Sequence, residues 1–91
     1  MADATSEQVY QVGVRVTLHA AVLDPQGQAI LHGLHALGFG AVEQVHAGKF
    51  FRLAIRAADP DAALAEARRA CERLLANPVI EDYTLAIEGQ S

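Results

Sequence analysis

The sequence contains no tryptophan, one cysteine, three phenylalanines and two tyrosines among its 91 residues. Because aromatic side chains are scarce, a hydrophobic core has to be built mainly from valine, leucine, isoleucine and alanine, and hydrophobic residues make up 52% of the chain. The single cysteine, Cys71, cannot form an intramolecular disulfide, which favours a reducing compartment. A domain this short buries only about 60–65% of its unfolded surface, so its apolar composition favours association with other chains.

Basic residues are also scarce, since seven Lys and Arg against eleven Asp and Glu give a formal net charge of −4. This balance argues against nucleic-acid binding, which needs a clustered basic face. No apolar run approaches the roughly 20 residues that cross a bilayer, and the polar segment Met1–Gln8 lacks the layout of a signal peptide. We therefore expect a soluble, cytoplasmic protein without nucleic-acid or membrane partners.

The first half of the chain predicts a strand followed by a helix. Val9–Leu18 alternates with a period of two, which is typical of a strand with one buried face. The apolar residues of that face are Val12, Val14, Val16 and Leu18. Asp24 can cap a helix and Pro25 suits its first position, so the helix over Gln28–Leu37 can begin as early as Pro25. Gly38 follows at the usual position of a helix stop.

The middle of the chain predicts a β-hairpin. Val42–His46 is expected to be a short strand, and Gly48 supplies the turn. Phe50–Arg56 alternates again and is expected to pair with it. The residues expected to face the core are Phe51, Leu53 and Ile55.

The last third predicts a long helix and a final strand. Asp59 and Pro60 repeat the cap-and-proline start, and the helix is expected over Asp61–Ala76. Its apolar stripe is Leu64, Ala67, Cys71, Leu74 and Leu75. The pair Asn77-Pro78 ends it, and Val79–Glu88 is the last strand. Tyr83, Leu85 and Ile87 share one face of that strand.

The element order β-α-β-β-α-β predicts an α+β fold of ferredoxin-like type. We expect a four-stranded antiparallel sheet with both helices on one face. Residues 9–88 form a single domain, between a tail over residues 1–8 and a tail over 89–91. The sheet face away from the helices is semi-apolar, so it is a candidate subunit interface, with an ordinary solvated face as the alternative.

The residues that could carry chemistry do not assemble into a catalytic site. His32 and His35 can share a helix face, but a transition metal needs three or four ligands, so surface histidines are favoured over a metal site. Cys71 lies in an apolar stripe, as a buried thiol would. Glu81 and Asp82 are adjacent on a strand and point to opposite faces. We predict no catalytic, cofactor-binding or metal-binding residues.

Six short segments, taken in order, resemble one family. They are Val14–Leu18, Val22–Gly27, Ala36–Gly38, Gly48–Lys49, Cys71–Glu72 and Leu74–Tyr83. In this order and in a chain of this length they resemble the PurS family, the small subunit of phosphoribosylformylglycinamidine (FGAM) synthase.

The resemblance implies a small, non-catalytic subunit that is a homodimer or a tetramer. In that family the subunit bridges a large ATP-dependent synthetase subunit and a glutaminase subunit, and it assists ammonia transfer in purine biosynthesis. ATP and magnesium would belong to the synthetase, so no cofactor is expected on this chain. The positions that the resemblance marks as partner contacts or structural motifs are Asp24, Pro25, Gln26, Gly27, Gly48, Lys49, Asn77, Pro78, Glu81, Asp82 and Tyr83.

Two departures from the family pattern are histidines. Relatives often carry Lys where His19 stands and Arg where His46 stands. If those cations meet a partner in the family, binding by this chain would depend on pH. A different class remains as an alternative: an ACT-like regulatory domain that binds a small ligand, with Asp24–Gly27 as the binding loop. Fold analogy alone supports it weakly, and the two motifs are not an ACT-like pattern.

Overall fold

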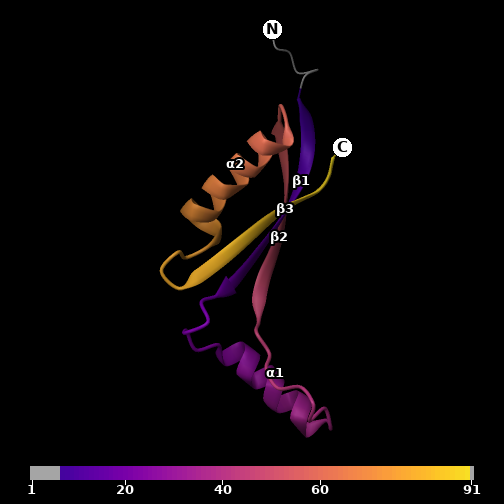
Figure 1. Ribbon diagram of the computed structural model, residues 1–91, viewed down its shortest axis with the longest axis vertical. Helices are drawn as coiled ribbons and strands as arrows, with labels where there is room; N and C mark the ends of the chain where they lie inside the picture. The colour runs from indigo at the N-terminus through magenta and orange to yellow at the C-terminus, as the bar shows by residue number, and fades with distance from the viewer. Residues whose placement is uncertain (1–6, 91) are drawn as a thin grey trace.

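The structure, a computed structural model, describes residues 7–90. Its elements follow the chain in the order drawn in Figure 1. They are β1 (Gln8–Leu18), α1 (Pro25–Ala36), β2 (Gly48–Ala57), α2 (Pro60–Ala70), a π-helical turn (Cys71–Leu75) and β3 (Glu81–Gln90). The first strand reaches into one predicted tail at Gln8, and the last strand reaches into the other at Gly89 and Gln90. Residues 1–6 and 91 of those tails lie outside the described residues.

The sheet is antiparallel with the strand order β2-β1-β3. The central strand is β1, and its alternating valines are the most buried side chains of the molecule: Val12, Val14 and Val16 are at most 1% exposed. The inward faces predicted for β2 and β3 are confirmed, because Leu53, Ile55, Leu85 and Ile87 pack against this row.

The sheet has three strands, so the prediction of four was wrong. Val42–His46 forms no strand, and the predicted hairpin is absent from residues 7–90. The reason lies in the contacts of this segment, which go to α1: the carbonyl oxygen of Val42 lies 2.7 Å from His35 Nε2, and the Ala47 N–H donates to Asp24. Val42 and Val45 are also three apart, so in a strand they would point to opposite faces.

Only α2 covers the sheet, so the expectation of two helices on one face was also wrong. Figure 1 shows α2 lying across the strands and α1 at the other end of the molecule. The molecule measures 61 × 27 × 14 Å and has a radius of gyration of 17.6 Å, whereas a compact domain of this length has about 12 Å. We call residues 20–47, which hold α1 and the extended segment after it, the arm.

The core lies between α2 and the sheet. One cluster holds Tyr10, Val12 and Ala57 from the strands with Ala63 and Ala67 from α2. The other holds Val14, Val16, Cys71 and Ala76. The prediction that Cys71 is a buried thiol is confirmed.

The end of α2 changes the pattern of buried residues. The Ala76 N–H donates to the Cys71 carbonyl, five residues back, at 3.0 Å, which is a π-type turn. The extra residue in this turn rotates Leu74 outward, and its side chain is 83% exposed. The prediction that Leu74 belongs to the apolar stripe was therefore wrong, while Leu75 and Ala76 pack against the core.

Candidate subunit-contact site

Asp24 joins the start of α1 to the chain that enters β2. Its Oδ1 accepts a hydrogen bond from the Gly27 N–H at 2.9 Å, as the predicted helix cap requires. Its Oδ2 accepts one from the Ala47 N–H, also at 2.9 Å. These two donors, Gly27 first and then Ala47, hold the pKa of Asp24 below its ordinary value of 3.8. Asp24 therefore stays ionised and holds two segments together at the base of the arm. We call a carboxylate that links two segments in this way a clamp.

Gly27 allows this clamp to form. It is the one buried residue of α1. A Cβ atom at this position would overlap the carbonyl oxygen of Val45 and would come within 2.5 Å of Asp24 Oδ2. The extended segment after α1 can therefore pack against the start of α1 only because residue 27 has no side chain.

Glu81 makes a second clamp, at the start of β3. Its Oε1 accepts the Asn77 N–H at 2.7 Å, and its Oε2 lies 3.4 Å from Lys49 Nζ at the start of β2. The hydrogen bond from Asn77 is the main cause that lowers the pKa of Glu81, and Lys49 adds to it. Asn77 also orders its own turn, since its Oδ1 accepts the Val79 N–H at 3.1 Å.

The two clamps face one cavity of about 400 Å³ between the base of the arm and the end of the sheet. Six of the eleven positions predicted from the resemblance line it: Asp24, Pro25, Gln26, Gly48, Lys49 and Glu81. Three stretches that lie far apart in the sequence supply these six residues, and the fold brings them together around one cavity.

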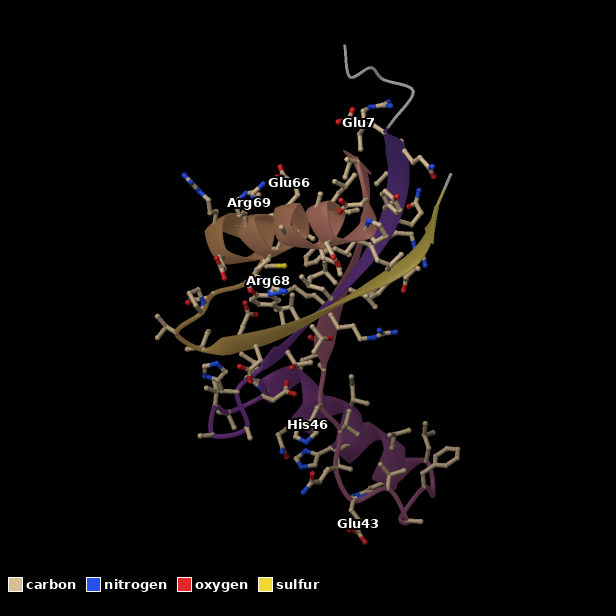
Figure 2. The ribbon with its side chains drawn as sticks, turned by 45° about the horizontal axis from the view of Figure 1, so that its top comes forward. Glu7, Glu43, His46, Glu66, Arg68 and Arg69 are labelled. Atoms are coloured by element: carbon tan, nitrogen blue, oxygen red, sulfur yellow. The ribbon has the colours of Figure 1, made fainter. Side chains whose placement is uncertain are left out.

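A larger cavity of about 950 Å³ adjoins the arm. His19 and Asp82 line it and form a pair, with His19 Nε2 at 3.2 Å from Asp82 Oδ1. His46 lines it too, with Nε2 at 3.2 Å from Gln44 Oε1. Figure 2 shows His46 and Glu43 on the arm, far from the charged residues Glu66 and Arg69 of α2. Both histidines thus line the larger cavity, together with the predicted positions Asp24 and Asp82. The signal that singled them out in the sequence is their departure from the family pattern.

Four of the predicted positions do not line these cavities: Gly27, Asn77, Pro78 and Tyr83. Tyr83 turns toward the π-helical turn after α2, and its hydroxyl donates to Glu72 Oε2 at 3.1 Å. Burial is the main cause that raises the Tyr83 pKa, and Glu72 adds to it. Pro78 is exposed in the turn before β3. Pro78 thus belongs to the turn before β3, and Tyr83 belongs to β3 itself.

Neither a metal cluster nor a membrane helix is found in residues 7–90. No group of three or more His, Cys, Asp and Glu side chains there could hold a metal ion. No described helix is long and apolar enough to cross a membrane.

The fold and the site together define a small α+β protein with a three-stranded sheet, one covering helix and an arm whose base is held by hydrogen-bonded turns. A model of one family, described as PurS: Phosphoribosylformylglycinamidine (FGAM) synthase, matches residues 11–89. The chain therefore belongs to the PurS family.

Individual relatives agree with this assignment. The phosphoribosylformylglycinamidine synthase subunit PurS of Bacillus subtilis (strain 168) is 44% identical over 80 residues, which are 88% of this chain and 94% of that protein. The crystal structure of Methanocaldococcus jannaschii PurS superposes with a TM-score of 0.79 at 35% identity and covers 87% of this chain and 95% of that one. A chain of the PurLQS structure from Thermotoga maritima gives 0.81 at 29% identity and covers 87% and 96%.

Proposed function

We propose that this chain is the small, non-catalytic subunit of a phosphoribosylformylglycinamidine synthase in purine biosynthesis. The observation that carries the proposal is the family match over residues 11–89. The likeness to a chain of PurLQS supports membership of a multi-subunit complex. The alternative of an ACT-like ligand-binding domain has no support from the family or the relatives.

The proposed role is to bridge the glutaminase and the ATP-dependent synthetase subunits and to assist ammonia transfer between them. The product would be formylglycinamidine ribonucleotide, made from formylglycinamide ribonucleotide. ATP and magnesium would bind to the synthetase, and this chain would act in the cytoplasm. The cavity that gathers Asp24, Lys49 and Glu81 is the surface we assign to contacts with these subunits.

We also propose that the chain is a homodimer or a tetramer. The support comes from the arm, whose apolar side chains lack cover in a single copy: Leu23 is 74% exposed, Leu37 76% and Phe39 55%. Large apolar patches on a soluble protein mark contact sites. A second copy packed on the arm would cover these side chains and add the buried area that a short chain lacks.

Reconstitution tests the role in coupling. Purified protein is mixed with the matching synthetase and glutaminase, and product formation is followed with glutamine and then with free ammonia as the nitrogen source. We expect glutamine-dependent synthesis to require this chain and ammonia-dependent synthesis to need it little. The proposal fails if the chain changes neither rate and joins no complex with the two subunits.

A further inference from the structure

The sheet has a second face, opposite α2, that no other part of residues 7–90 covers. We call it the open face. Its residues alternate along the three strands: Gln11, Gly13, Arg15 and Thr17 from β1, Phe50, Arg52, Ala54 and Arg56 from β2, and Asp82, Thr84, Ala86 and Glu88 from β3. The face therefore carries three of the seven basic residues of a chain whose net charge is −4.

Two of these arginines stack on one aromatic ring. The guanidinium carbons of Arg15 and Arg52 lie 5.3 and 5.6 Å from the centroid of the Phe50 ring. These are cation–π distances, so the ring orients both side chains. Phe50 itself is 45% exposed. The result is an ordered, solvent-facing group of two cations and one ring.

Glu88 fixes one of the two arginines from the far strand. Its side chain passes over Gly13 of β1, where a Cβ atom would meet Glu88 Oε2 at 2.5 Å. It reaches Arg52, whose Nε donates to Glu88 Oε1 at 2.9 Å. A glycine in the central strand thus leaves room for an ion pair that spans the whole sheet.

The other two arginines lack such a partner. Within residues 7–90, Arg15 and Arg56 form no ion pair, and both are exposed. Asp82, at the end of the face, is paired with His19. The open face therefore offers unneutralised guanidinium groups, whose planar donors suit carboxylates.

We propose that the open face docks a carboxylate-bearing surface of a different subunit of the complex. The inference rests on the function proposed above and adds the surface and the chemistry of the contact. Arginine and aromatic residues are enriched in the centres of such interfaces. A second copy fits poorly, because its open face would offer three arginines and only two carboxylates, Asp82 and Glu88, both of which are already paired. A head-to-tail contact with another copy would not close into a dimer.

The test compares two charge reversals. Arg15→Glu changes an open-face arginine that has no ion pair to break. Arg73→Glu is the matched control, because it makes the same change in net charge at an exposed position in the π-helical turn. Affinity for the purified synthetase and for the glutaminase is measured separately by calorimetry at low and high salt, and the oligomeric state by sedimentation.

We expect Arg15→Glu to weaken binding to one of the two subunits by about tenfold or more. The binding of the wild type should also weaken with salt more steeply than that of this variant. Arg73→Glu should bind like the wild type, and the oligomeric state should be the same in all three. Circular dichroism confirms that each variant is folded.

Three outcomes would overturn the inference. The first is unchanged binding of Arg15→Glu to both subunits. The second is a changed oligomeric state of Arg15→Glu alone, which would assign the face to a second copy. The third is binding that inorganic phosphate abolishes at concentrations where chloride of equal ionic strength does not, which would assign it to a phosphate ligand. If the wild type itself fails to couple the two subunits, the proposed function fails instead.

Discussion

Replacing Gly27 by alanine should weaken the base of the arm, although the same change usually strengthens a helix. Glycine to alanine in a helix interior gains about 0.5–1 kcal/mol. Here the new Cβ would collide with the Val45 carbonyl and with Asp24, and overpacking of this kind costs about 1–3 kcal/mol. The net expectation is a loss of about 1–2 kcal/mol in the stability of the contact between α1 and the chain that follows it.

Gly33 provides the matched control within the same helix. A Cβ atom at Gly33 has nothing within 4 Å, so Gly33→Ala should stabilise α1 by about 0.5–1 kcal/mol. Native-state hydrogen exchange is the suitable assay, because it reports local opening that global unfolding does not. The Ala47 amide, which is bonded to Asp24, should exchange faster in Gly27→Ala and at an unchanged or slower rate in Gly33→Ala. Equal slowing in both variants would refute the steric reasoning.

Four further predictions concern the core and the two clamps. Cys71→Ser places a hydroxyl in an apolar site and should lower the free energy of unfolding by about 1–3 kcal/mol. The loss should be smaller for Cys71→Ala. Urea titrations measure both values, and equal losses would contradict this prediction. Since burial raises the pKa of the Cys71 thiol, alkylation of the native protein should be slow and should speed up in urea, and fast native alkylation would show an open site. The pKa values of Asp24 and Glu81 are lowered, so their contribution to stability is present above their ordinary values of 3.8 and 4.5 and is lost as the pH falls through the folded values. Asp24→Asn should therefore differ from the wild type at pH 7 and converge with it in acid, and a constant difference would count against the clamp. Lys49→Gln should change stability by less than about 1 kcal/mol, because Lys49 is half exposed, while lowering glutamine-dependent synthesis; unchanged synthesis would remove Lys49 from the contact surface.

The three strands could be predicted because alternation records one buried face directly. Val12, Val14 and Val16 were assigned to the core from spacing alone, and they are buried. Spacing could not show where α1 lies, because an apolar stripe does not reveal what covers it. The segment Val42–His46 was predicted as the first strand of a hairpin with a glycine turn, whereas this part of the chain is bonded to α1 and to its cap, Asp24.

The candidate site was predicted as a set of positions and not as an arrangement. The hydrogen bond between Asp24 and Ala47 joins residues that are 23 apart in the sequence. The pair of His19 with Asp82 joins the residue after β1 to the start of β3. Neither has a local sequence signal. The exposure of Leu74 could not be predicted either, because an apolar pattern with a period of 3.6 residues does not indicate where a π-type turn occurs.

The arm interrupts what is otherwise a simple β-hairpin. β1 and β2 are antiparallel neighbours, and Thr17 lies opposite Gly48 at the point where the chain leaves for the arm. Apart from Gly27, the buried residues lie in the strands, α2 and the turn that follows it. The folding core and the arm are thus encoded in separate stretches of the chain. A short turn that joins Thr17 to Gly48 in place of the arm should therefore leave the folding core intact and give an armless module for engineering.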